Sequence, residues 1–138
     1  MKTWLVDTGP FVAYLSRTDP RHPDVVDALD GFTGQLVTTA AVVTEAMYFL
    51  ADTPDGPLSF AELLMASEIQ IAGVGEPTQS LAAARLMAKY ADTPMDFADA
   101  TIVLLADQLR VFDVITLDRR GFSTYRTAQG KPFRLVLT

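Results

Sequence analysis

Short apolar runs alternate along this chain with longer segments of helical character. The runs at 3–6, 35–39 and 111–117 are short enough to be buried strands, and the weaker runs at 69–74 and 133–137 extend the same pattern. Helices are expected between them, from about 9, and at 23–29, 40–51, 59–68, 78–91 and 96–109, with Ser59, Thr78 and Asp96 as three of the N-caps. This alternation predicts an α/β fold with a mostly parallel central sheet and helices on both faces. Its 138 residues fit a single domain, 1–138.

Four acidic residues stand beside these apolar segments. Asp7 and Asp118 each end a predicted strand, whereas Glu45 and Asp99 lie inside apolar helical stretches. Ligands of parallel α/β sheets sit outside the carboxyl ends of the strands, so all four acids can converge at one edge. Carboxylates among apolar neighbours are costly unless a cation meets them. An acid-only cluster without His or Cys ligands predicts Mg²⁺ or Mn²⁺ and phosphoryl chemistry, in preference to zinc.

Each acid also has a purely structural explanation when it is taken alone. Asp7 and Asp118 can be turn residues, and Asp99 can favour a helix N-terminus through the helix dipole. Asp96 precedes Asp99 by three residues, as a helix cap precedes a first-turn acid, so we assign it mainly to capping and secondarily to supporting the site. His22 is the only histidine and lies in a Pro-flanked loop, where we expect it to be solvated.

Charge is distributed unevenly along the chain. All 17 acidic residues lie in 1–118 with six of the 11 basic ones, and the last five bases follow in 119–138: Arg119, Arg120, Arg126, Lys131 and Arg134. This basic tail either holds nucleic-acid phosphates or is a solvated surface that balances the acidic remainder. The chain has no cysteine, no apolar run near the roughly 18 residues of a membrane helix and no secretory signal, so we expect a cytoplasmic protein without membrane contact.

Four motifs in this order resemble the PIN-domain ribonucleases, with the VapC-type toxins of prokaryotic toxin–antitoxin pairs as the most similar branch. The motifs are Val6-Asp7-Thr8-Gly9, Thr44-Glu45, Phe97-Ala98-Asp99-Ala100 and Thr116-Leu117-Asp118-Arg119-Arg120-Gly121-Phe122. The resemblance covers essentially the whole chain. It implies that Asp7, Glu45, Asp99 and Asp118 are the metal-binding acids, and that Thr116 orients an acid or a water through its hydroxyl.

The function implied by this resemblance is a Mg²⁺- or Mn²⁺-dependent endoribonuclease that leaves 5′-phosphate and 3′-hydroxyl ends. A bound metal would hold the scissile phosphate and activate a water, and one carboxylate would help to deprotonate or orient that water. Arg119, Arg120 and Arg126 are the expected contacts to RNA phosphates. The resemblance further implies a homodimer and a cognate antitoxin that brings a basic or apolar segment to the acidic cleft.

Two other functions remain open from the sequence. A PIN-like module could bind RNA or a partner without cutting it, although all four acids are present. The run Leu5-Val6-Asp7-Thr8-Gly9 also resembles the catalytic loop of aspartic proteases. Those enzymes need an all-β fold and two such aspartates, and this chain has one copy, so a dimer would have to supply the second.

Overall fold

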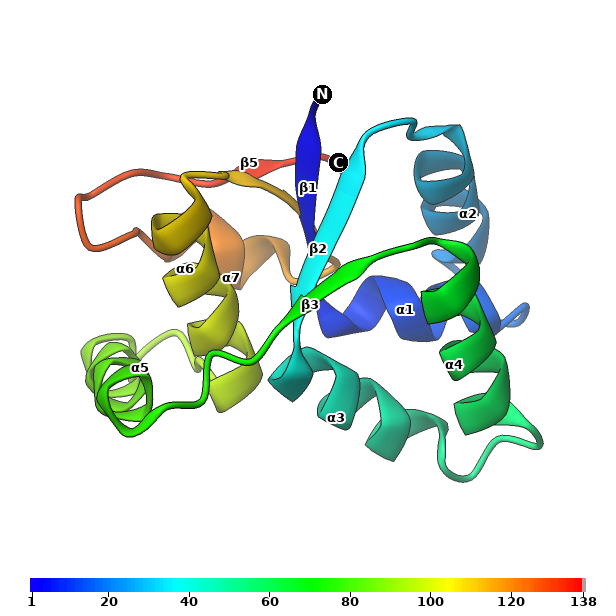
Figure 1. The fold of residues 1–138 in the computed structure, drawn as a ribbon, viewed down its shortest axis with the longest axis horizontal. Helices are drawn as coiled ribbons and strands as arrows, with labels where there is room; N and C mark the ends of the chain where they lie inside the picture. The colour runs from blue at the N-terminus through cyan, green and yellow to red at the C-terminus, as the bar shows by residue number, and fades with distance from the viewer. Residues whose placement is uncertain (138) are drawn as a thin grey trace.

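A five-stranded parallel sheet with seven helices around it makes up residues 1–137, the part of the chain that the computed structural model describes (Figure 1). The strand order is β3-β2-β1-β4-β5, and every neighbouring pair is parallel. Helices α5 and α6 lie on one side of the sheet, and α1, α2 and α4 on the other (Figure 1). The predicted α/β architecture is confirmed. In chain order the elements are β1 (Thr3–Val6), α1 (Thr8–Leu15), α2 (His22–Gly31), β2 (Gln35–Thr39), α3 (Ala40–Leu50), α4 (Gly56–Ala66), β3 (Gln70–Ala72), α5 (Pro77–Lys89), α6 (Phe97–Leu109), β4 (Asp113–Ile115), α7 (Arg119–Thr124) and β5 (Arg134–Leu135).

Strand β1 is the centre of the sheet, paired with β2 on one side and β4 on the other. Its residues Leu5 and Val6 are fully buried, as are Val114 and Ile115 of β4. Apolar side chains on both faces of central strands are typical of a parallel sheet covered by helices on both sides. The carboxyl ends of β1 and β4 therefore lie side by side, which brings Asp7 toward the residues that follow β4.

Two helices begin earlier than the sequence predicted. The predicted N-caps Ser59 and Thr78 are wrong, because α4 begins at Gly56 and α5 at Pro77, so that both residues lie inside a helix. A proline occupies the first turn of each helix, where its missing N–H costs nothing. The short helix α7 was not predicted at all.

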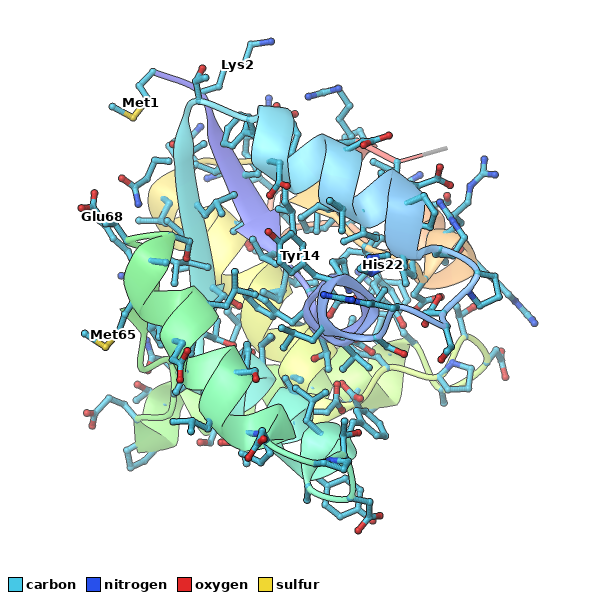
Figure 2. All side chains as sticks on the ribbon, turned by 90° about the vertical axis from the view of Figure 1, so that its right-hand side faces the viewer. Met1, Lys2, Tyr14, His22, Met65 and Glu68 are labelled. Carbon is cyan, nitrogen blue, oxygen red and sulfur yellow. The ribbon has the colours of Figure 1, made fainter. Side chains whose placement is uncertain are left out.

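His22 is not a free loop side chain. It begins α2, and its Nδ1 donates a 2.7 Å hydrogen bond to the carbonyl oxygen of Ala13 in α1. Figure 2 shows the ring lying across α1, with Tyr14 close by on the same helix. The histidine therefore fastens α2 to α1, and the expectation of a solvated residue was wrong.

Among residues 1–137, no helix is both long enough and apolar enough to cross a bilayer.

The connection between α2 and β2 leaves no room for a side chain at Gly34. A Cβ there would collide with the backbone carbonyl of Lys2 and with the ring of Phe32. We expect Gly34→Ala to lower the free energy of unfolding by about 1–3 kcal/mol, the usual cost of overpacking. Urea denaturation measures this loss.

Gly31 provides the matched control, because it is the last residue of α2, just before this connection, and a Cβ there would meet nothing within 4 Å. Gly31→Ala should be neutral or slightly stabilising, since alanine has the higher helix propensity. Equal destabilisation by both substitutions would contradict the steric explanation.

Candidate functional site

A hollow of about 510 Å³ opens at the carboxyl ends of β1 and β4. It is lined by six acidic residues and no basic one, together with Thr8, Gly9, Val12, Phe49 and Leu117. All four acids singled out in the sequence line it, as does Asp96. The sixth acid, Asp19, was missed. The full acidic set is Asp7, Asp19, Glu45, Asp96, Asp99 and Asp118.

Asp7 is held by a hydrogen bond that crosses from one central strand to the next. It is 5% exposed, and its Oδ2 accepts a 2.7 Å hydrogen bond from the hydroxyl of Thr116. The oxygen of that hydroxyl in turn accepts one from the backbone N–H of Asp118, at 3.0 Å. This is the kind of contact expected of Thr116, and it links the two acids that follow β1 and β4.

Asp118 begins α7 as its N-cap. Its Oδ1 accepts a 3.0 Å hydrogen bond from the backbone N–H of Gly121. A Cβ on Gly121 would collide with this carboxylate and come within 2.9 Å of the Tyr125 hydroxyl oxygen. Glycine is therefore required at 121 because the backbone lies directly under the carboxylate that caps it.

Asp96 and Asp99 cap each other at the start of α6. The backbone N–H of Asp99 donates to Asp96 Oδ1 at 2.8 Å, and that of Asp96 donates to Asp99 Oδ2 at 3.1 Å. This is a capping box, so the predicted N-cap role of Asp96 is confirmed. The same exchange fixes both carboxylates at the rim of the hollow.

Glu45 enters the hollow from the second turn of α3, a helix that begins where Thr39 caps it after β2. Thr8 lies near this carboxylate, but its buried Oγ1 has no hydrogen-bond partner within residues 1–137. A hydroxyl that is 5% exposed and unpartnered is costly unless something in the hollow bonds to it. The hollow therefore offers an unused polar atom beside its acids.

Burial and mutual repulsion raise the pKa of three of these acids. The pKa of Asp99 rises to about 8, through burial first and then through Asp7 and Asp96. The pKa of Glu45 rises to about 7, through burial and Asp96, and that of Asp7 to about 6, chiefly through burial. The Thr116 hydrogen bond opposes the rise at Asp7. Carboxylates in this state favour either a proton or a cation.

The hollow brings acidic groups together, but their side chains do not yet form the coordination sphere of a metal ion. Within residues 1–137, no three His, Cys, Asp or Glu side chains are already arranged to hold a metal ion. Side-chain rotation would have to complete such an arrangement. Oxygen donors without soft ligands still fit a hard divalent ion in chemical type, and the unpartnered hydroxyl of Thr8 fits a bound ligand or water.

Asp19 gave no signal in the sequence, where it belongs to the loop 19–23 between two helices. In the structure its Oδ1 accepts a 2.8 Å hydrogen bond from the backbone N–H of Arg21, and this turn places it at the rim of the hollow. Only the path of the loop over the sheet edge brings it there.

The three expected RNA contacts lie outside the hollow. Arg119 and Arg120 are exposed on α7, and neither side chain makes a hydrogen bond or ion pair within residues 1–137. Arg126 instead donates from Nη1 to the carbonyl oxygens of Ser123, Thr124 and Tyr125, and so closes the end of α7. In the same tail, Arg134 pairs with Asp113 at 2.8 Å.

We expect the protein without metal to lose stability as the pH rises, because its acids have pKa values above those of the unfolded chain. Such groups hold their protons more tightly when folded, so their contribution is complete below about pH 4 and is lost as the pH passes the folded values. For Asp7, Glu45 and Asp99 those values are about 6, 7 and 8. The thermal midpoint in chelator should therefore fall between about pH 5 and about pH 8.

Asp99→Asn should flatten this decline and melt higher than wild type near pH 8, because it removes the most strongly raised carboxyl and keeps an oxygen for the Asp96 amide. Asp107→Asn is the control, since Asp107 is on the same helix and bonds to the Ala128 amide at 2.9 Å, away from the hollow. The thermal midpoint of Asp107→Asn should fall with pH as that of wild type does. A lower midpoint for Asp99→Asn at pH 8 would show that this carboxylate is satisfied by the helix start.

Comparisons with known proteins agree with this architecture. Residues 4–127 match the family model described as PIN domain. Ribonuclease VapC26 of Mycobacterium tuberculosis is 33% identical over 134 residues, covering 96% of this chain and 98% of the relative.

Among solved structures, the Mycobacterium tuberculosis toxin VapC20, described as cleaving the sarcin-ricin loop, superimposes with a TM-score of 0.74 at 16% identity, over 83% of this chain and 89% of that one. FitAB bound to a DNA fragment gives a TM-score of 0.62 at 23% identity, over 86% and 87%. These two similarities concern the fold. The match to the family model and the full-length similarity to a ribonuclease together show that the chain belongs to the PIN-domain family and is a homologue of the VapC ribonuclease toxins.

Proposed function

We propose that this protein is a Mg²⁺- or Mn²⁺-dependent endoribonuclease whose metal is held by Asp7, Glu45, Asp99 and Asp118. The observation that carries the proposal is a hollow lined by six carboxylates and no basic side chain, three of them with raised pKa values. Such a site is repulsive when it is empty and favourable when it holds a cation. Its VapC26 relative, a ribonuclease by name, indicates RNA as the substrate.

Three of the proposed ligands each have one oxygen that the fold fixes through a hydrogen bond. Asp7 Oδ2 accepts from Thr116, Asp99 Oδ2 from the Asp96 amide, and Asp118 Oδ1 from the Gly121 amide. In the proposed site, each of these carboxylates would meet the metal through its other oxygen. Carboxylates used through one oxygen suit the octahedral Mg²⁺ better than Ca²⁺, which often takes both oxygens.

In this proposal the bound ion would hold the scissile phosphate and lower the pKa of a water that attacks phosphorus in line. The protein fixes the positions of the carboxylates. Asp7 and Asp118 are fixed by Thr116 and by the cap of α7, and Asp99 by its exchange with Asp96. One of the carboxylates orients or deprotonates the water. Thr8 Oγ1 is free to bond to that water or to a phosphate oxygen.

Arg119 and Arg120 are the proposed contacts to the RNA backbone. They follow directly after Asp118, are exposed, and are not consumed by partners within residues 1–137. Arg126 contributes to RNA binding only if it gives up its bonds to the end of α7. We therefore assign the electrostatic part of RNA binding mainly to the first two arginines.

We also propose a cognate protein partner, a homodimer and a cytoplasmic site of action, in line with the toxin relatives. One further solved structure of the same fold is VapBC2 of Rickettsia felis, bound to a DNA fragment from the promoter of its genes. Beside the acidic hollow lies a second one of about 570 Å³, with exposed Tyr48, Phe49 and Phe97. The two share Glu45, Phe49 and Asp96. An antitoxin segment that carries basic and apolar side chains is complementary to this pair of surfaces.

The two alternative functions differ from the proposed nuclease in turnover and in fold. A PIN-like module that binds without cutting would have the same fold and would show no metal-dependent turnover. An aspartic protease would need an all-β fold, and the parallel α/β sheet excludes it.

RNA cleavage by the purified protein should require Mg²⁺ or Mn²⁺ and stop in excess EDTA, with little support from Ca²⁺. Asp7→Asn and Asp99→Asn should each lower the cleavage rate by about a hundredfold or more, as loss of a group that stabilises reacting charge commonly does. Mg²⁺ should also raise the thermal midpoint of wild type by mass action, and that of Asp99→Asn much less.

Two variants control for this experiment. Asp96→Asn should keep most activity, because asparagine caps helices about as well as aspartate. Asp107→Asn should keep all of it. Full cleavage in EDTA would refute the metal mechanism, and an inactive Asp96→Asn would refute the assignment of Asp96 to capping.

The salt dependence of RNA binding tests the two arginines. Each lost phosphate contact lowers the slope of log affinity against log salt by roughly 0.7 for single strands, so the double variant Arg119→Gln and Arg120→Gln should lower it by about 1.4. Filter binding over a range of salt concentrations gives the slope.

Arg134→Gln is the matched control, since that guanidinium is already paired with Asp113. Its slope should stay at the wild-type value. An unchanged slope in the double variant would make the tail a solvated surface.

A further inference from the structure

Tyr125 connects two parts of the acidic hollow that are distant in sequence. It follows α7 directly and is fully buried. Its hydroxyl donates a 2.8 Å hydrogen bond to the carbonyl oxygen of Pro94, 31 residues earlier, and lies 3.4 Å from that of Thr93. Pro94 stands two residues before Asp96, the first member of the capping box. The hydroxyl therefore holds the segment that leads into α6.

The same hydroxyl lies beside the turn that Asp118 caps. It occupies the space next to Gly121, where a Cβ would come within 2.9 Å of its oxygen. Gly121 in turn donates its N–H to the Asp118 carboxylate. One side chain thus lies between the cap of α7 and the segment before α6, the two places that supply Asp118, Asp96 and Asp99.

The ring of Tyr125 is fixed independently of its hydroxyl. It packs edge-on against Phe122 and Tyr90, with ring centroids 5.2 Å and 5.1 Å apart. Burial and the nearby carboxylates, Asp99 foremost, raise the pKa of the phenol above its ordinary value, so the hydroxyl keeps its proton and remains a donor. The hydrogen bond can therefore be removed without disturbing the packing of the ring.

We infer that Tyr125 is a positioning residue of the acidic hollow, whose hydroxyl holds the start of α6 in register with the start of α7. The expected effect on metal binding rests on the proposed metal site. The positioning of α6 by the hydroxyl rests on the geometry alone. The segment before α6 lies outside the sheet, so no strand pairing fixes its distance from Asp118. The simpler explanation is that a buried tyrosine hydroxyl needs some partner. That explanation predicts a loss of stability and no change at the acids.

Tyr125→Phe tests the inference, with Tyr90→Phe as its matched control. Tyr90 belongs to the same aromatic cluster and also uses its hydroxyl, which accepts from the Arg126 amide at 2.9 Å. Within residues 1–137, the hydrogen bond of Tyr90 to the segment before α6 is made by its backbone carbonyl, which accepts from the Thr93 amide and is unchanged by the substitution. Isothermal titration with Mn²⁺ should show an affinity about three- to tenfold weaker for Tyr125→Phe, the usual worth of one hydrogen bond. Tyr90→Phe should bind as wild type does.

Amide hydrogen exchange supplies a readout that needs no metal. Exchange at Asp99 and Ala100 should be faster in Tyr125→Phe than in Tyr90→Phe at equal global stability, because the capping box is less firmly held. Equal Mn²⁺ affinities and equal exchange in the two variants would overturn the inference. Failure of wild type to bind Mn²⁺ would instead refute the metal site, and the exchange data would still decide the role of Tyr125.

Discussion

Carboxylates crowded at the edge of the sheet, with no basic side chain among them, are the constraint on which the rest of the site depends. Six acids line one hollow, and burial raises the pKa of three of them above the ordinary range of a carboxyl. A fold gains nothing from such crowding by itself, because like charges repel and buried charges lose hydration. The arrangement is favourable only with protons or a cation in place, and sites that sacrifice stability in this way are commonly built for function.

The hydrogen bonds around the hollow show how the protein holds these groups apart and in place. Asp7 is held by Thr116, Asp118 by the amide of Gly121, and Asp96 and Asp99 by each other's amides. All of these donors are neutral, so they orient the carboxylates without cancelling their charge. The negative potential of the hollow is therefore kept available for whatever enters it.

Much of the fold could be predicted from the sequence, because strand and helix periodicities are local. The apolar run before Asp7 and the acidic pair Asp96 and Asp99 each carried their own signal, and both predictions hold in the structure. The starts of α4 and α5 were misplaced because Pro57 and Pro77 compete with Ser59 and Thr78 as start signals. That the acids would lie together depended on the order of the strands in the sheet. It was only an expectation until the structure showed them around one hollow.

Other features had no local signal. Asp19 reaches the hollow only through the path of its loop, and His22 finds a carbonyl on a neighbouring helix. Arg126 turns back onto the end of α7, which composition alone cannot distinguish from a free basic side chain. Tertiary contacts of this kind are set by the packing of elements and not by spacing along the chain.

The central place of β1 also bears on how the protein is made. Strand β1 is synthesised shortly before its neighbour β2, but its other neighbour, β4, follows only after the five further elements that lie between β2 and β4. Asp7 can accept the hydrogen bond of Thr116 only after the 109th residue that follows it has been synthesised. A nascent chain, or one cut short before β4, has neither the complete sheet nor the complete set of acids. The hollow can therefore assemble only after β4 and the residues that follow it have been synthesised and have joined the sheet.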